Sequence, residues 1–270
     1  MPELPEVETI VRGLAKRVTG DTITSVWIGS RKQPLKSSAA KIASTLEHRQ
    51  VARVHRAGKH IVFELASNGS PAGAQWIVHL GMTGRLLVCE PSAKIEKHTH
   101  LIAQLASRRE LRFIDPRMFG KLSVHRTGFD PGGIEPLEAR EDQFLALFRG
   151  RKTPIKSALL NQKLLRGVGN IYADESLFRS GIRPRRRASS LTRDDLRRLF
   201  RAVQEVLNEA IQLGGSSISD YVDADGEEGF FQLQHRVYGR EGEPCLICGA
   251  PVKRIVITGR SSHYCPKCQK

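Results

Sequence analysis

The chain of 270 residues is long enough for one large or two ordinary domains, each with its own hydrophobic core. Its 43 lysines and arginines against 28 acidic residues give a formal net charge of +15. Because these basic residues are not gathered into one amphipathic stretch, we expect a nucleic-acid partner before a membrane. No apolar run approaches the length of a membrane span, and the acidic N-terminus lacks the apolar region of a signal peptide, so we expect a cytoplasmic protein.

The first segment, MPELPEVETI, is predicted to lead into a helix. Apolar residues recur on one helical face at Val7, Ile10, Val11, Leu14 and Val18. Prolines ahead of a helix and acids in its first turn are ordinary, because the N-terminal dipole favours negative charge. Glu6 and Glu8 fit this role, whereas Pro2 and Glu3 allow a second interpretation.

Pro2 and Glu3 are candidates for chemistry. A small second residue permits removal of Met1. The proline nitrogen is then a secondary α-amine with a pKa of about 7.7–8.0. When such an amine attacks a sugar aldehyde carbon, loss of water leaves a cationic iminium. The iminium acidifies the adjacent C–H and allows a phosphate to be eliminated, with Glu3 carrying protons. If Met1 were retained, the proline nitrogen would be an amide and this nucleophile would not exist.

The rest of the N-terminal half is predicted to be β. Short β-branched or alternating stretches, broken by glycine or polar turns, occupy 23–29, 50–65 (two strands around a turn at Gly58), 76–80, 84–88, 101–105 and 110–114. This pattern predicts a β-sandwich or flattened barrel, in which Cys89 is a buried small hydrophobe. A stretch rich in proline and glycine at 128–142 marks a domain boundary.

Beyond that boundary the hydrophobic period becomes helical. Thr153 and Pro154 have the pattern of an N-cap followed by proline at the first helical position. A glycine turn at 166–170 joins two further helical pieces. Thr192 is predicted to open a long helix that ends at Gly214 and Gly215, before a polar loop at 216–229.

Four of the five cysteines stand at the C-terminus in two pairs with the spacing of a zinc ribbon: Cys245, Cys248, Cys265 and Cys268. In a cytoplasmic protein each pair would supply two thiolates to one tetrahedral zinc ion, which is a structural site. Two disulfides are the alternative. The whole pattern predicts an α+β protein with a β domain, a helical domain and a terminal zinc hairpin, and the three together suggest DNA binding.

At this point the sequence resembles the bacterial formamidopyrimidine-DNA glycosylase family, zinc-containing enzymes that excise 8-oxoguanine and ring-opened purines. The matching segments, in chain order, are MPELPEVET, RAGKH, HLGMTG, DPRMFG, TPIK with GVGNIYADESLF, VYGR-x-GEPC, and GR-SSHYCPKCQ. The resemblance implies an N-terminal β-sandwich domain with a leading helix at 1–130, a helix–two-turns–helix domain at 131–235 and a zinc finger at 236–270. It also implies one structural zinc ion, a double-stranded DNA partner, a bacterial cytosolic or nucleoid location and a monomer.

The resemblance assigns four catalytic residues. Pro2 corresponds to the family's Schiff-base nucleophile and Glu3 to its general acid/base. Lys59 corresponds to a catalytic lysine that contacts the lesion or its phosphate, although by itself it resembles an exposed turn lysine. Arg260, in the turn of the zinc hairpin, corresponds to the arginine that grips the lesion phosphates. The implied activity is that of a bifunctional glycosylase and abasic-site lyase.

The resemblance also assigns DNA contacts. Met82, Arg117 and Phe119 correspond to the wedge that fills the duplex when the lesion is flipped out, with Arg117 contacting the orphaned cytosine. By sequence alone, Met82 and Phe119 would be core residues. Phosphate contacts are implied for His98, Arg151, Lys156 and Asn170. Glu175 corresponds to a buried acid that could equally be a polar helix contact, and the 216–225 loop to a lid over the flipped base.

Two positions depart from the family pattern, and two other functions stay open. Met118 stands where family members often have a basic residue, and His60 where a tyrosine is common. One alternative is the sister enzyme type that removes oxidised pyrimidines, and damage specificity separates the two. The other is a non-catalytic zinc-ribbon protein that binds nucleic acid, which needs neither Pro2 nor Glu3.

Overall fold

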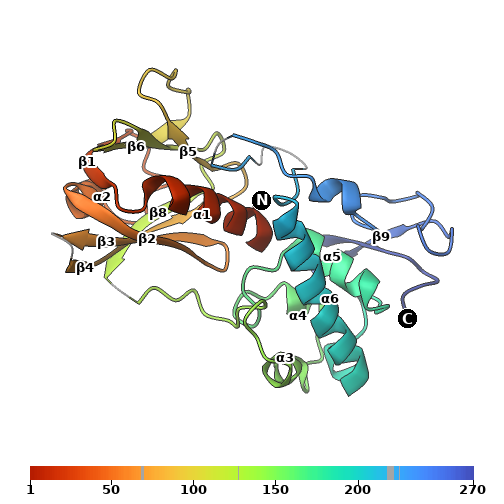
Figure 1. The fold of residues 1–270 in the computed structure, drawn as a ribbon. Helices are drawn as coiled ribbons and strands as arrows, with labels where there is room; N and C mark the ends of the chain where they lie inside the picture. The colour runs from red at the N-terminus through yellow and green to blue at the C-terminus, as the bar shows by residue number, and fades with distance from the viewer. Residues whose placement is uncertain (68–69, 127, 218–221, 225) are drawn as a thin grey trace. The chain divides into compact units, whose positions relative to one another are not determined.

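The structure is a computed structural model that describes residues 1–67, 70–126, 128–217, 222–224 and 226–270. The chain forms two compact units (Figure 1). Unit 1 comprises Met1–Asp130 and Gly214–Phe230, and unit 2 comprises Pro131–Leu213 and Phe231–Lys270. The predicted α+β class is confirmed, and the finer division into three domains stays a prediction. No helix in the described ranges is both long and apolar enough to cross a membrane.

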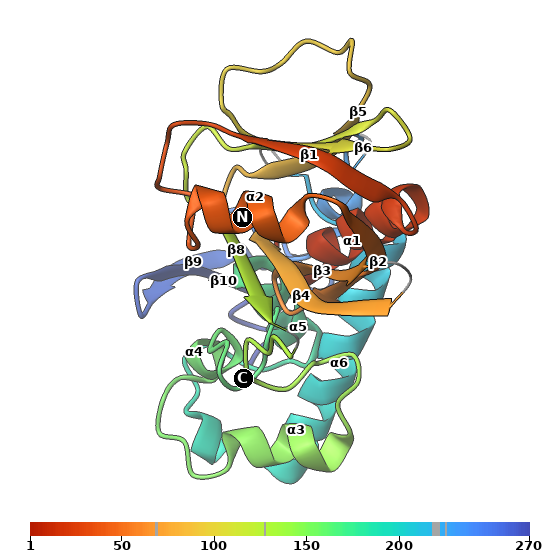
Figure 2. The same cartoon turned by 90° about the vertical axis from the view of Figure 1, so that its left-hand side faces the viewer.

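Unit 1 is built on one antiparallel sheet of eight strands in the order β5-β7-β6-β1-β2-β3-β4-β8. The strands are β1 (Thr22–Ile28), β2 (Arg49–Ala57), β3 (His60–Ser67), β4 (Ser70–His79), β5 (Arg85–Cys89), β6 (Thr99–Leu105), β7 (Glu110–Ile114) and β8 (Lys121–Arg126). In the register of β1 with β2 only two pairs are formed, Thr22 with Gln50 and Ile23 with Arg49. The sheet therefore divides there into two halves, which Figure 2 shows as two layers, as the predicted sandwich requires.

Two helices complete the core of unit 1. α1 (Leu4–Val18) buries the face predicted from its apolar spacing, with Val7, Leu14 and Val18 inaccessible to solvent. These residues pack with side chains from both halves of the sheet, such as Trp76 and Phe113. α2 (Ala39–Leu46) begins after Ser38, whose hydroxyl accepts the Lys41 N–H, and it contributes Ile42 and Leu46 to the same core. Neither α2 nor β8 was predicted from the sequence.

Unit 2 begins with helices. They are α3 (Glu141–Phe148), α4 (Ile155–Leu159), α5 (Asn170–Arg179) and α6 (Arg193–Gln212), with 3-10 turns at Ala188–Ser190 and Phe231–Gln234. α3, which was not predicted, lies beside α6 (Figure 2) and packs Phe144 on Phe200. α6 begins as predicted, since the Thr192 hydroxyl accepts the Asp195 N–H at 3.1 Å. The N-cap predicted at Thr153 is wrong by one residue, because α4 begins at Ile155 and Pro154 is its N-cap.

A two-stranded hairpin follows the helices in unit 2. It pairs β9 (Lys253–Ile257) with β10 (Arg260–Tyr264), and Ile257 lies opposite Arg260. The two turn residues, Thr258 and Gly259, both have positive φ, at 48° and 73°. A two-residue hairpin turn whose twist matches that of antiparallel strands can require a positive φ at both of its central residues. The turn therefore places Arg260 as the first residue of the returning strand, where its side chain is exposed.

Candidate active site and DNA-contacting residues

The N-terminal residues lie at the buried start of α1. Pro2 and Glu3 are buried, whereas Met1 is 46% exposed. Glu3 is the N-cap residue of α1, and its N–H donates to Glu6 Oε2 at 2.7 Å. This bond is one half of a capping box, the arrangement typical of a helix start. Helix capping and a functional Pro2–Glu3 pair are therefore compatible, because the cap fixes the backbone directly after Pro2.

Glu6 does more than begin a helix. Its second oxygen, Oε1, accepts the Ser216 N–H at 2.8 Å, and the carboxylate is almost fully buried. Gly215 has a φ of +84°, and a Cβ there would lie 2.9 Å from Glu6 Cγ and Oε1. Glu6 thus joins the N-terminal turn to the first residue of the predicted 216–225 lid. Of that lid, residues 218–221 and 225 lie outside the described residues.

Lys59 follows the glycine turn of the β2–β3 hairpin, in which Gly58 has a φ of +59°. The lysine is only 8% exposed, unlike the exposed turn lysine that its sequence alone suggests. The next residue, His60, has its ring 4.9 Å from that of His79. Burial, followed by the nearby charges of His60, Lys121 and Lys59, lowers the pKa of His79 to about 3, so this histidine is neutral at pH 7.

The three predicted wedge residues are exposed. Met82 is 42% exposed and Phe119 is 52% exposed, so the alternative that they are core residues is wrong. The Arg117 guanidinium carbon lies 4.9 Å from the centre of the Phe119 ring, within the range of a cation–π contact. All three side chains are therefore accessible to a partner.

His98 lies at the end of a loop that a buried arginine holds in place. Arg112, on β7, is 2% exposed, and it donates to the carbonyls of Glu90, Ala93 and Lys94 and to the Glu110 carboxylate. His98 itself is half-buried. The sequence contains no signal for Arg112, because a strand arginine is ordinarily solvent-exposed.

In unit 2, two predicted contact residues meet at the zinc hairpin. Asn170 is the first residue of α5, and its Nδ2 lies 3.3 Å from Ser261 Oγ. Lys156 is fully buried, with Nζ 2.6 Å from Asp174 Oδ1 and donating to the Ser261 carbonyl at 2.6 Å. Both residues therefore fix Ser261, the residue that follows Arg260. A phosphate contact through the Lys156 ammonium does not fit this burial, because the ammonium is enclosed within the unit.

The two remaining predicted residues of unit 2 differ in exposure. Arg151 is exposed, and its Nε donates to the Leu147 carbonyl. Glu175 is fully buried on α5 and accepts three successive backbone N–H groups, from Arg236, Val237 and Tyr238, at 2.8–2.9 Å. Burial raises the pKa of Glu175, although the three N–H donors oppose that rise. Glu175 therefore fixes the segment that leads into the zinc finger.

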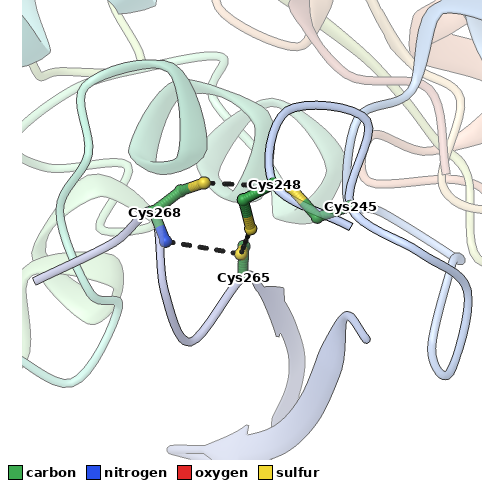
Figure 3. Close-up of side chains that lie close together, drawn as sticks. All are labelled: Cys245, Cys248, Cys265 and Cys268. Carbon is green, nitrogen blue, oxygen red and sulfur yellow. Dashed lines mark hydrogen bonds between the residues drawn. The ribbon is translucent and has the colours of Figure 1, made fainter. Parts of the chain in front are cut away.

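The four C-terminal cysteines form one cluster (Figure 3), with all four Sγ atoms within 4.8 Å of one another. The Cys245–Cys268 and Cys248–Cys265 sulfur pairs are 3.9 Å and 3.4 Å apart. These separations are far longer than a disulfide bond of about 2.05 Å. They match the sulfur–sulfur edge of about 3.8 Å that follows from tetrahedral Zn–S bonds of about 2.3 Å. The disulfide alternative is therefore wrong, and the cluster suits one zinc ion with no open coordination position.

Comparison with known proteins accounts for the chain in three consecutive parts. Residues 1–122 match the formamidopyrimidine-DNA glycosylase N-terminal domain, residues 133–222 match its H2TH domain, and residues 242–270 match the zinc finger found in FPG and IleRS. These matches agree with the predicted zinc site and with the resemblance that the sequence motifs indicate.

Full-length relatives and solved structures agree with these matches. The chain is 46% identical to the formamidopyrimidine-DNA glycosylase of Solibacter usitatus and 43% identical to that of Gluconobacter oxydans, with all of each chain covered. It resembles the crystal structure of the MutM (Fpg) protein of Thermus thermophilus with a TM-score of 0.88 and 42% identity, covering 99% and 98% of the two chains. A Lactococcus lactis Fpg mutant in complex with Fapy-dG-containing DNA matches with a TM-score of 0.91 and 34% identity over the whole of both chains. The protein belongs to the formamidopyrimidine-DNA glycosylase family.

Proposed function

We propose that the protein is a base-excision repair enzyme that removes oxidised purines from duplex DNA. Its substrates are formamidopyrimidines and 8-oxoguanine opposite cytosine, and it acts as a monomer. Family membership supports the glycosylase activity, and the Lactococcus lactis relatives were solved with DNA that contains Fapy-dG or an abasic site. The observation on which the proposal chiefly depends is the buried Pro2–Glu3 pair at the start of α1.

The proposed chemistry starts at the Pro2 nitrogen once Met1 is removed. The neutral secondary amine attacks the sugar C1′ and loses its proton, and the damaged base leaves as its bond to C1′ breaks. The C1′–O4′ bond of the sugar ring then opens with protonation of O4′, which leaves an iminium between the nitrogen and C1′. The iminium withdraws electrons from C2′, so a proton leaves C2′ and the 3′ phosphate is eliminated, followed by the 5′ phosphate. The product is a one-nucleotide gap with phosphates at both ends. This lyase activity distinguishes the proposal from a glycosylase that acts through water alone.

Three residues serve these steps. Glu3, adjacent to the amine, transfers protons to the leaving groups and from the sugar. Lys59 contacts the lesion or the phosphate beside it, and its low exposure keeps the ammonium in one place. Arg260 grips the lesion phosphates and assists the second elimination. Zinc, bound by the four cysteines, holds the hairpin of Arg260 and takes no part in bond breaking, because its ligand positions are filled.

DNA contacts fall into two groups. Met82, Arg117 and Phe119 fill the space left by the everted nucleotide, and their exposure supports this role. His98, Arg151 and Asn170 contact phosphates, and Asn170 does so at the N-terminus of α5, where backbone N–H groups favour an anion. With a net charge of +15, binding should weaken steeply as salt rises.

Borohydride trapping tests the nucleophile. The protein is incubated with duplexes that carry 8-oxoguanine opposite cytosine, reduced with borohydride, digested and analysed by mass spectrometry. We expect a covalent adduct on a peptide that begins at Pro2. A variant with an uncleaved extension before Met1 is the control and should give no adduct, because its proline nitrogen is an amide. If protein that begins at Pro2 gave no adduct, even with an abasic-site duplex, the lyase proposal would be refuted.

The oxidised-pyrimidine alternative has one observation in its favour. A wild-type Lactococcus lactis relative, 34% identical, was solved with oxidised-pyrimidine-containing DNA. The trapping experiment therefore includes a matched duplex with an oxidised pyrimidine at the same position. Faster adduct formation with 8-oxoguanine or a formamidopyrimidine supports the purine assignment. The reverse order would assign the protein to the sister activity.

A further inference from the structure

Two loops of unit 1 carry the three wedge residues and touch each other directly. The first loop, residues 80–84, carries Met82, and the second, residues 115–120, carries Arg117 and Phe119. Gly81 makes the contact possible, because a Cβ there would lie 2.5 Å from the Gly120 nitrogen and the Phe119 carbonyl carbon. The backbones of the two loops are therefore in van der Waals contact, which no side chain at position 81 would permit.

A single buried carboxylate joins the two loops. Asp115 is fully buried, and its Oδ1 accepts the Thr83 hydroxyl at 2.6 Å from the first loop. Within its own loop, Oδ1 accepts the Arg117 N–H at 3.3 Å and Oδ2 accepts the Gly120 N–H at 2.7 Å. The carboxylate thus holds both ends of the second loop and one residue of the first. Hydrogen bonds to a buried charged acceptor are stronger than neutral ones.

The second loop needs this support because its backbone is strained. Met118 has a φ of +57°, in the left-handed region that a methionine rarely adopts, and its N–H donates to the Asp115 carbonyl at 3.3 Å. Such conformations persist only where the surroundings fix them. Thr83, itself buried, adds a further contact, since its hydroxyl oxygen lies 3.3 Å from the Arg117 nitrogen. The buried Asp115 carboxylate and Thr83 hydroxyl, together called the frame, therefore hold the backbone that carries the exposed wedge residues.

We infer that Asp115 and Thr83 are positioning residues that lock the two loops into one rigid wedge. Insertion of Met82 into the duplex and the contact of Arg117 with the base opposite the lesion then occur together. Discrimination between cytosine and adenine at that position depends on the frame, although neither Asp115 nor Thr83 touches DNA. This inference rests on the proposed function, because it assumes that Arg117 contacts the opposite base.

Thr83→Val tests the inference, since valine keeps the shape of threonine and removes the hydroxyl. The readout is the dissociation constant for a duplex with a tetrahydrofuran abasic analogue opposite adenine, divided by the dissociation constant for the same duplex with cytosine opposite the analogue. This ratio requires no catalysis. A well-formed base-edge contact discriminates by about 5- to 150-fold. We expect Thr83→Val to lower this ratio about tenfold and Thr83→Ser to restore it within about twofold. Asp115→Asn should lower the ratio as well, because its amide group cannot accept at both ends of the loop.

A matched control is Thr45→Val on α2, where the same hydroxyl is removed from a half-buried residue that donates to the Lys41 carbonyl. It should leave the ratio unchanged. The inference is overturned if folded Thr83→Val keeps the wild-type ratio, or if the wild-type protein itself does not distinguish cytosine from adenine. Failure of the proposed function is detected separately, as the absence of a borohydride adduct on Pro2 in the wild-type protein.

Discussion

Replacing Lys156 by methionine distinguishes a buried structural lysine from a DNA contact. Methionine retains most of the lysine's apolar stem and removes the ammonium. In the structure that ammonium is fully buried, 2.6 Å from an Asp174 oxygen and 2.6 Å from the Ser261 carbonyl. The variant therefore leaves a buried carboxylate without its cation and a carbonyl without its donor.

The expected loss follows from these contacts. Removing one partner of a buried ion pair costs about 3–5 kcal/mol, because the remaining charge stays buried. Asp174 also accepts the His263 N–H at 2.9 Å, which compensates part of that charge, so we expect about 3 kcal/mol for Lys156→Met. Asp174→Asn should cost a similar amount. The double variant should cost clearly less than the sum, by about 1.5 kcal/mol or more, since neither charge is then left alone.

The assay must report on unit 2. Both tryptophans, Trp27 and Trp76, lie in unit 1, so urea unfolding is followed through zinc release and far-ultraviolet circular dichroism instead. DNA binding is measured in parallel over a range of salt concentrations. A lysine bound to a phosphate would instead lower the salt slope by about 1 and leave stability nearly unchanged. A loss of stability below about 1 kcal/mol, with a reduced salt slope, would refute the structural role.

Three further predictions concern other parts of the chain. The purified protein should contain about one zinc ion per chain, and a chelator should weaken DNA binding at least about tenfold, reversibly on zinc addition; binding unaffected by zinc loss would contradict a structural site. Glu6→Gln should cost about 1–3 kcal/mol and speed amide exchange at Glu3 or Ser216, because one amide oxygen cannot serve both N–H groups; unchanged exchange at both amides would count against the bridge. Because the folded pKa of His79 lies near 3 and the unfolded value near 6.5, stability of unit 1 should fall as pH drops below 6.5, by at most about 1.4 kcal/mol per pH unit. Unfolding followed by tryptophan fluorescence should give a stability that depends less on pH for His79→Asn than for the wild-type protein. The asparagine side-chain oxygen can still accept the Gly81 N–H. An equal slope of stability against pH in both proteins would contradict His79 as the origin of the pH dependence.

Local pattern was sufficient for most elements of the fold. Alternation and glycine turns predicted the strands β1 to β7, because each strand packs only one face or lies between clear breaks. The missed elements have weaker local signals. α2 buries only Ile42 and Leu46, and the strand β8 directly follows a turn and precedes a stretch rich in proline and glycine. Strand order could not be predicted, since the pairing of β1 with β6 joins residues far apart in the chain.

Site residues could be predicted from the sequence where the residue types and their spacing alone indicate the chemistry. The four cysteines carry their spacing and ligand type in the sequence, and their sulfur atoms converge as expected. Burial of charged residues was not predictable. Lys156 and Asp115 are polar in every local pattern, and only partners distant in sequence, such as Ser261 for Lys156, explain why each is inside. The bonds that position a site are thus harder to predict than the groups that react.

The discontinuity of unit 1 has a consequence for the newly synthesised chain. The Glu6 bond to Ser216 joins positions 210 residues apart, and the Val88 N–H donates to the Ala224 carbonyl, which also lies far along the chain. At about 5–20 residues per second, a ribosome needs on the order of 10–40 s to pass from Glu6 to Ser216. The sheet can pair during this time, whereas the surroundings of the N-terminal turn stay incomplete. We therefore expect removal of Met1 to take place on a nascent chain whose N-terminus has yet to be enclosed.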